Sequence, residues 1–235
     1  MGRAFEFRKV RKFKRWDRMS KAFTKIGREI AIAVRLGGPD PAGNARLRMA
    51  VTNAKGVNMP KDRVDAAIKR ASSKEEANYQ EALYEGYGPH GVSIVVECAT
   101  DNPTRTVANI RMHFSHGGGT MANTGALDFL FERKGVFKLP AEGVDMDVLE
   151  LDLIDAGADD IEVEEGVITV YTSFQGFAHM QKSLEEKHIA VTSAEIQRLP
   201  TSLKDLGEAE EEEVLELIDS LEQDDDVQAV YHNLK

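Results

Sequence analysis

Residues 91–99 read Gly-Val-Ser-Ile-Val-Val-Glu-Cys-Ala, a run that is apolar on both alternating sets of positions. Its β-branched residues favour an extended backbone. A strand with apolar side chains on both faces is typical of the interior of a sheet that is covered on both sides. The run therefore predicts a buried central strand around which a domain assembles.

The residues that follow this strand predict a helix and further extended structure. Asn102-Pro103-Thr104 is a typical helix start, and the helix continues to about Phe114 before three consecutive glycines end it. Residues 126–139 contain several aromatic and β-branched residues with Gly135 among them. This stretch predicts either one bulged strand or two short strands.

The end of the chain predicts one helix, at 211–221, and one strand, at 227–232. A single helix and a single strand cannot bury a core of their own. We therefore expect both to return to the sheet that begins at Gly91 and to complete it.

A second α/β unit is predicted between these two halves. Helices at 147–156 and 174–186 alternate with strands at 160–163, 167–171 and 190–197. The order helix–strand–strand–helix–strand is enough for a compact ferredoxin-like layer.

The N-terminal residues predict a small helical domain. Apolar residues recur at helical spacing in 8–35, 44–55 and 60–71. Glycines and prolines in 36–41 end the first helix. The third helix is expected to begin with Asn58 as its cap and a proline in its first turn.

These elements predict an α+β fold with three domains. Residues 72–80 are polar and resemble a linker. The predicted domains are a basic arm and three-helix domain (1–75), a discontinuous middle α/β sandwich (82–140 plus 204–235) and an inserted ferredoxin-like α/β sandwich (141–203).

Charge is divided unequally along the chain. The net charge is −10, but residues 1–75 hold 20 Lys and Arg against 7 Asp and Glu, a net +13, which leaves −23 for residues 76–235. A basic module attracts phosphates by releasing their counterions, and an acidic remainder is repelled by them. The division favours nucleic acid or a ribonucleoprotein as the partner, although a purely solvated basic face has the same composition.

The densest positive charge lies in residues 8–18, interleaved with Phe5, Phe7, Phe13 and Trp16. Cations contact phosphates, and aromatic rings stack on unpaired bases. The second and third helices continue the positive surface and form a corner similar to a helix-turn-helix, which any three-helix bundle also contains. The candidate nucleic-acid-binding residues are Arg8, Lys9, Arg11, Lys12, Lys14, Arg15, Arg18, Lys21, Lys25, Arg28, Arg46, Arg48, Lys55, Lys61, Arg63, Lys69 and Arg70.

Other classes of function find little support in the sequence. Cys98 is the only cysteine, so no internal disulfide or multi-cysteine metal site is expected. His113 and His116 lack a third ligand, and the acidic runs 210–213 and 224–226 resemble solvated faces more than cation sites. No nucleophile elbow or nucleotide-binding motif occurs. We therefore expect no catalytic residues, no metal, no cofactor, no small-molecule substrate and no membrane span, in a cytoplasmic protein that is not an enzyme.

Several strings together resemble one known family, the YebC/PmpR family of probable transcriptional regulators, which also includes a mitochondrial translational activator. The resemblance covers about residues 20–235. The strings are Phe23-Thr24-Lys25, Arg28-Glu29-Ile30, Arg35-Leu36-Gly37-Gly38-Pro39-Asp40-Pro41, Asn58-Met59-Pro60-Lys61, Tyr84-Glu85-Gly86-Tyr87-Gly88-Pro89, Thr100-Asp101-Asn102, Phe131-Glu132-Arg133-Lys134-Gly135 and Asp226-Val227-Gln228-Ala229-Val230-Tyr231-His232-Asn233.

The resemblance implies three domains with a discontinuous middle one, and a cytoplasmic, non-enzymatic regulator that acts on nucleic acid. Family members are described as DNA-binding regulators of transcription and as factors that act on the ribosome, including at stalls. They usually open with Gly-His-Ser-Lys-Trp, whereas this chain has Gly2-Arg3-Ala4-Phe5-Glu6-Phe7. A specific contact made by that tip does not transfer to this chain, although positive charge and an aromatic residue are retained.

Two functions therefore remain open. In the first, the helical domain and arm bind duplex DNA and regulate transcription. In the second, the same arm binds ribosomal RNA and regulates translation, and the mixture of aromatic and basic residues favours this structured-RNA alternative. The family's usual assignment favours DNA, so DNA-directed regulation is our prediction.

Overall fold

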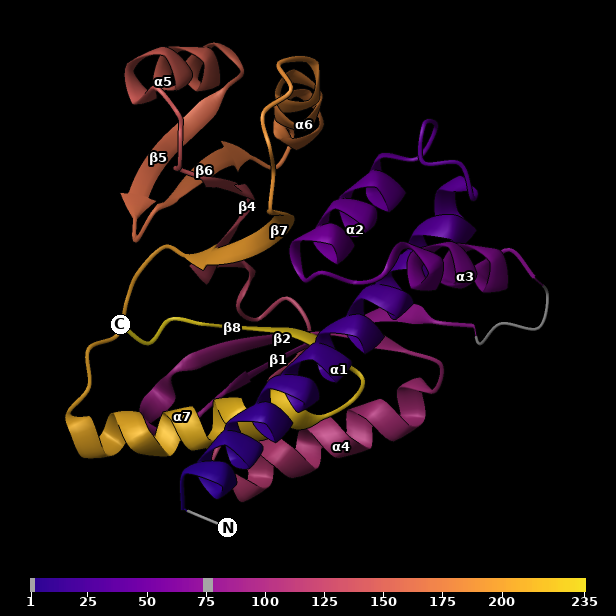
Figure 1. The fold of residues 1–235 in the computed structure, drawn as a ribbon. Coiled ribbons are helices and arrows are strands. Elements are labelled where there is room, and N and C mark those ends of the chain that lie inside the picture. Colours follow the sequence, from indigo (N-terminus) through magenta and orange to yellow (C-terminus); the bar gives the residue numbers. More distant parts are fainter. Residues whose placement is uncertain (1–2, 74–77) are drawn as a thin grey trace. The chain divides into compact units, whose positions relative to one another are not determined.

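The computed structural model describes residues 3–73 and 78–235, and the side chains of residues 3–18 and of residue 147 lie outside the description. The chain divides into two compact units at residue 76 (Figure 1). The first unit is helical, and the second contains two antiparallel four-stranded sheets with helices packed on them. The predicted α+β class is thus confirmed.

Three helices form the first unit: α1 (Arg3–Gly37), α2 (Ala45–Gly56) and α3 (Lys61–Ala71). Their apolar faces meet in one core, which contains Ile30, Ala33, Val34, Leu47, Ala50, Ala54, Val64 and Ala67. Except for Ala50, these are residues whose three- and four-residue spacing predicted the helices, so the predicted amphipathic faces are the buried ones.

Asn44 fixes the corner between α1 and α2. Its side-chain oxygen accepts a hydrogen bond from the backbone N–H of Leu47 (3.0 Å), which caps α2. Its Nδ2 donates to the carbonyl oxygens of Ala33 (2.7 Å) and Gly38 (2.8 Å), at the end of α1. A Cβ at position 37 would lie 2.7 Å from the Asn44 side chain, so Gly37 is required for this close approach.

We expect Asn44→Ala to lower the free energy of unfolding of the helical unit by about 2–4 kcal/mol, since it removes a cap and leaves a buried carbonyl oxygen without its donor. Denaturant unfolding monitored by circular dichroism measures the change. Asn44→Asp keeps the acceptor for the Leu47 N–H but not the two donors, so it should also destabilise the unit. A variant as stable as the parent would contradict this role of Asn44.

The predicted start of the third helix was wrong in detail. Asn58 does not cap α3; its φ of 57° places it in the left-handed region, where it ends the turn after α2. Pro60 is the N-cap residue, and its carbonyl accepts from the backbone N–H groups of Arg63 and Val64. Asparagine tolerates this backbone conformation better than most residues, which explains its position.

The first sheet of the second unit has the order β3-β1-β2-β8, all antiparallel. Its strands are β1 (Gln80–Tyr87), β2 (Ser93–Thr100), β3 (Thr120–Met121) and β8 (Val227–His232), with a short 3-10 turn, η1 (Pro89–Gly91), between β1 and β2. Helices α4 (Pro103–His116) and α7 (Glu208–Gln223) cover one face (Figure 1).

Strand β2 is the predicted central strand, and it lies between β1 and β8. Val92, Ile94 and Val96 pack with α4 and α7 on one side. On the other side, Val95 packs with Leu127 and Phe131. Both faces are covered, which is the reason that both sets of alternating positions are apolar.

The chain end returns as predicted. Strand β8 pairs with β2 over the stretch from Ile94–His232 to Cys98–Val227, and α7 packs its apolar face on the same core. The middle α/β domain is therefore discontinuous in sequence.

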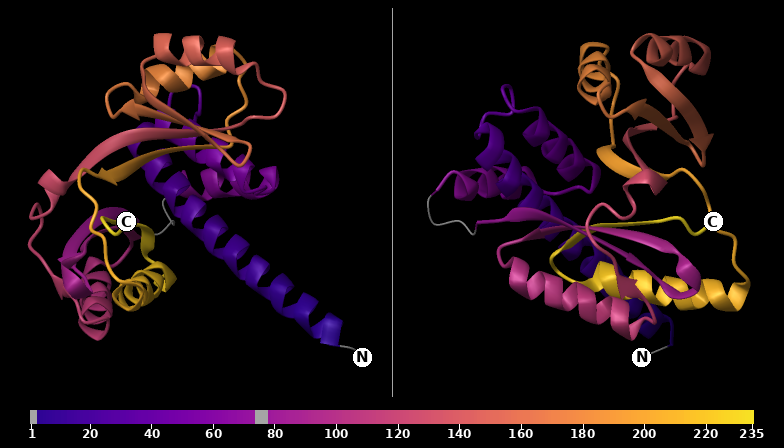
Figure 2. Two further views of the ribbon diagram at one scale, coloured as in Figure 1. Left: turned by 90° about the vertical axis from the view of Figure 1, so that its left-hand side faces the viewer. Right: turned by 180° about the vertical axis from the view of Figure 1, so that it is seen from behind.

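The second sheet has the order β5-β6-β4-β7. Its strands are β4 (Phe131–Pro140), β5 (Ala158–Glu164), β6 (Val167–Ser173) and β7 (Ser193–Pro200), and helices α5 (Met146–Asp155) and α6 (Phe177–Glu186) lie on one face (Figure 2). The chain order β4-α5-β5-β6-α6-β7, with this strand order, is the ferredoxin-like arrangement.

Strand β4 differs from expectation in two ways. Residues 128–130 form a 3-10 turn (η2, Asp128–Leu130) and β4 is a single strand that pairs without irregularity on both sides, so there is neither a bulge nor a pair of short strands. Gly135 instead allows close packing: a Cβ there would lie 2.6 Å from Thr172 Oγ1 and 2.7 Å from the Phe177 ring. The strand pairs with β6 and β7, so it belongs to the sheet of the inserted segment, although the expected boundary follows residue 140.

Candidate nucleic-acid interface

The predicted basic arm lies on α1. The backbone of residues 8–18 is helical, but the side chains of its seven candidate cations lie outside the described residues. Lys21, Lys25 and Arg28 follow on the same helix and are half-buried. Each of these three side chains is engaged within the protein. The structure thus places the arm at the start of a long helix rather than in a separate extended segment.

Two of the predicted cations have structural contacts inside the helical unit. Arg46 Nε donates to Glu29 Oε1 at 2.8 Å, which joins α2 to α1. Arg48 Nη1 donates to the carbonyl oxygens of Pro41 (2.8 Å) and Ala42 (2.9 Å), in the loop before α2. Both guanidinium groups therefore support the helix corner.

The cations of α3 differ from Arg46 and Arg48 in their exposure. Lys61, Lys69 and Arg70 are exposed, as is Lys55 at the end of α2. In the part of the chain that the structure describes, no hydrogen bond or ion pair engages these four side chains. Among the described residues no contact offsets their charges, so these cations are candidates for binding an external anion.

Arg63 combines an exposed position with a contact inside the helical unit. It is exposed, and its guanidinium carbon lies 5.9 Å from the centre of the Phe23 ring. A cation above an aromatic ring is held in place while its N–H groups stay open to a ligand. This pair was not predictable from the sequence, because residues on two different helices come together only in the folded unit.

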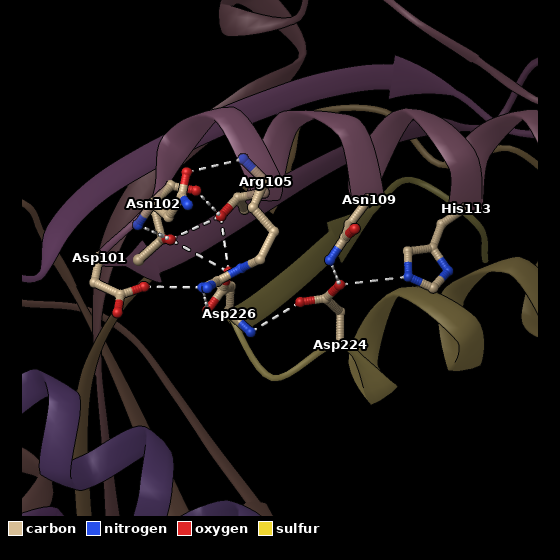
Figure 3. A network of polar contacts seen from close by, with 9 residues as sticks. Asp101, Asn102, Arg105, Asn109, His113, Asp224 and Asp226 are labelled. Atoms are coloured by element: carbon tan, nitrogen blue, oxygen red, sulfur yellow. Dashed lines mark hydrogen bonds and ion pairs between the residues drawn. The ribbon is translucent and has the colours of Figure 1, made fainter.

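Carboxylates of the two acidic runs, 210–213 and 224–226, contact protein groups. Asp226 is buried, and its carboxylate accepts from Thr106 Oγ1 (2.8 Å), Thr100 Oγ1 (3.2 Å) and Arg105 Nη2 (2.8 Å) (Figure 3). The hydrogen bond to Asp226, with a second one to Asp101, raises the pKa of the Arg105 guanidinium.

Asp224 extends the same network toward His113. Its carboxylate accepts from Asn109 Nδ2 at 3.1 Å and from the backbone N–H of Asp226 at 2.9 Å. His113 Nε2 lies 3.5 Å from Asp224 (Figure 3). Its Nδ1 lies 2.7 Å from Ser220 Oγ. The network joins α4 to the end of α7 and to β8, so His113 and the two carboxylates hold the returning chain in place.

The earlier acidic run, at the start of α7, also contacts a histidine. His90 Nε2 lies 2.8 Å from Glu213 Oε2, and His90 Nδ1 lies 3.6 Å from Glu210 Oε1. Across residues 19–73 and 78–235, no group of three or more His, Cys, Asp or Glu is arranged to hold a metal ion. No described helix is both long and apolar enough to cross a membrane.

Comparison with known families decides where this architecture belongs. A model described as "TACO1/YebC protein N-terminal domain" matches residues 3–74, and a model described as "TACO1/YebC second and third domain" matches residues 79–234. The chain belongs to the TACO1/YebC family. The boundary between the two matches coincides with the boundary between the helical unit and the α/β unit.

Individual TACO1/YebC relatives agree over full length. A "probable transcriptional regulatory protein" of Cytophaga hutchinsonii is 54% identical over 234 residues, with 100% of this chain and 98% of the relative covered. One of Anaeromyxobacter dehalogenans is 52% identical, with 100% of both chains covered. A crystal structure of a conserved hypothetical protein from Aquifex aeolicus is similar with a TM-score of 0.82 and 37% identity, over 92% of this chain and 90% of that one.

Proposed function

We propose that this TACO1/YebC chain is a cytoplasmic, non-enzymatic regulator of gene expression that binds DNA through its N-terminal helical unit. The observation that carries the proposal is the set of exposed cations on α3 and at the end of α2, which have no partner among the described residues of a segment with net charge +13. Phosphates are the abundant ligands that such a surface attracts. The names of the relatives support a regulator of transcription.

The ribosome is the second candidate target. The mixture of aromatic and basic residues between Phe5 and Arg18 suits structured or unpaired RNA, because rings stack on unpaired bases and cations follow the backbone. Residues 76–235 contain 33 Asp and Glu. In that case the acidic α/β unit would face basic proteins or solvent.

The contribution of α3 is tested by replacing Lys61, Lys69 and Arg70 together with Ala. We expect weaker binding to every duplex sequence, and a slope of log affinity against log salt that is flatter by up to about 2.7, since each phosphate contact contributes about 0.9. Fluorescence anisotropy over a salt series measures both quantities. The control variant replaces Lys138, Lys182 and Lys235 with Ala. It removes the same number of positive charges from exposed positions of the other unit. Equal slopes for the two variants would remove α3 from the contact surface.

The target is identified by crosslinking in cells followed by sequencing of the attached nucleic acid. Promoter fragments that decrease in the α3 variant support the proposal. Ribosomal RNA fragments that decrease in the same variant support the second candidate. Crosslinks that do not respond to the α3 variant would contradict the role of α3, and the arm in residues 8–18 would then have to account for the binding.

A further inference from the structure

Helix α5 of the inserted domain has two apolar faces, and the domain uses only one of them. Leu149, Leu153 and Ala156 are buried against the second sheet. Val148, Leu151 and Ile154 are 59%, 67% and 53% exposed. At 100° per residue, the second set lies on the side of the helix nearly opposite the first. The exposed set is therefore not a margin of the core but a separate apolar stripe.

The edge strand of the second sheet carries another exposed aliphatic residue. Val163 of β5 pairs with Ile168, which is fully buried, so Val163 points to the face of the sheet that carries the helices. Strand β5 is the edge strand of its sheet, and Val163 is 52% exposed there. We name Val148, Leu151 and Ile154 the α5 stripe. Exposed aliphatic residues gathered in this way mark an interaction site more often than isolated ones do.

The surroundings of the α5 stripe are acidic. Residues 142–165 contain 11 Asp and Glu and no Lys or Arg. Two of these carboxylates are paired with lysines from neighbouring segments, Asp152 with Lys187 and Asp159 with Lys134.

Charge and hydrophobicity together select one kind of partner. Nucleic acid and anionic lipid surfaces would be repelled by the carboxylates. A second copy of the same stripe would bring like charges together. A helix with apolar residues on one face and Lys or Arg beside them would cover the stripe and neutralise its rim.

We propose that the α5 stripe is a docking surface for a protein partner that presents a cationic amphipathic helix. This inference goes beyond the proposed function, because it concerns the acidic inserted domain and a protein rather than the basic unit and nucleic acid. The protein would then bind nucleic acid with one domain and a basic protein partner with another.

The probe for this surface is a fluorescent peptide of about 14 residues, four helical turns, with Leu on one face and Lys on the other. Full-length protein is titrated with this peptide and with a permuted peptide of the same composition that has no amphipathic pattern. Leu151→Lys is compared with Leu215→Lys, which makes the same change at a 43% exposed leucine on the acidic helix α7. Thermal melts show that both variants remain folded, as expected for exposed positions.

We expect Leu151→Lys to weaken peptide binding at least about tenfold, Leu215→Lys less than about twofold, and the permuted peptide to bind at least about tenfold more weakly. Nitrogen-15 NMR shifts on addition of peptide should concentrate in residues 146–164. Equal effects of the two variants, equal binding of the two peptides, or no saturable binding would overturn the proposal. So would concentration-dependent self-association that Leu151→Lys abolishes, since the occupant would then be a second copy.

Discussion

Asp226→Ala is expected to lower the free energy of unfolding of the middle domain by about 3–5 kcal/mol, the largest stability change that we predict. The carboxylate is 4% exposed and accepts from two threonine hydroxyls and from Arg105, so its removal leaves three donors without their acceptor. The backbone at this residue also matters to the sheet, because the Asp226 carbonyl accepts from the N–H of Ala99 at 2.8 Å.

Two further variants separate charge from packing at this position. Asp226→Asn keeps the size of the side chain but places an amide where one carboxylate oxygen accepts, so we expect a smaller loss of stability than for alanine. Asp219→Ala removes an exposed carboxylate from α7 and should change stability by less than about 0.5 kcal/mol. Guanidinium unfolding curves give all three values. If Asp226→Ala proved no more destabilising than Asp219→Ala, the network would not hold the returning chain.

The same part of the chain shows what sequence reasoning can reach. The run 91–99 predicted β2 because it is apolar on both faces, and the structure shows a separate core on each side. The return of β8 followed from the inability of one helix and one strand to bury a core. Arguments of this kind succeed because burial of apolar surface depends on pattern more than on contact detail.

Strand β1 was missed because its polar residues are satisfied by distant segments. Residues 80–87 contain Glu85, which is 2% exposed and accepts from the backbone N–H groups of Gly125 (2.8 Å) and Leu127 (2.7 Å). A buried carboxylate breaks the apolar alternation that identifies a strand. Its partners lie about 40 residues away along the chain, so no local pattern reveals them.

The sequence predicted which segment is basic, but not which of its cations lie exposed on the surface. Composition separates a basic segment from an acidic one. It does not distinguish Arg46, which pairs with Glu29, from Lys61 or Lys69, which are exposed without a partner among the described residues. The α5 stripe was missed for a related reason: α5 is apolar on two sides, and the sequence alone does not show which side the sheet covers.

Replacing Lys9, Arg11, Lys12, Lys14 and Arg15 together with Ala should cause a loss of nucleic-acid affinity at least as large as that of the α3 variant. Binding should weaken uniformly across sequences, because phosphate contacts do not distinguish bases. Five independent contacts would flatten the slope of log affinity against log salt by about 4.5 on duplex DNA. Anisotropy titrations over a salt series, with duplexes of different sequence, measure both effects.

The helical backbone of residues 3–37 limits that number. At 100° per residue, positions 9, 11, 12, 14 and 15 are distributed around most of a straight helix, so one rigid duplex cannot meet all five. We therefore expect a flattening of about 2–3, comparable with the α3 variant rather than twice as large. Alanine preserves the helix, and an unchanged circular dichroism spectrum verifies this.

The size of the change distinguishes two modes of binding by the arm. In the same titration on folded RNA, a flattening close to 4.5 would mean that the nucleic acid surrounds α1, since only a partner on several sides reaches every position. A flattening of 2–3 fits a helix lying against one side of a duplex. An unchanged slope would show that the arm makes no phosphate contacts, and the exposed cations of α3 would then have to account for the binding alone. Salt titrations on duplex DNA and on folded RNA thus test the arm and separate its two modes of binding.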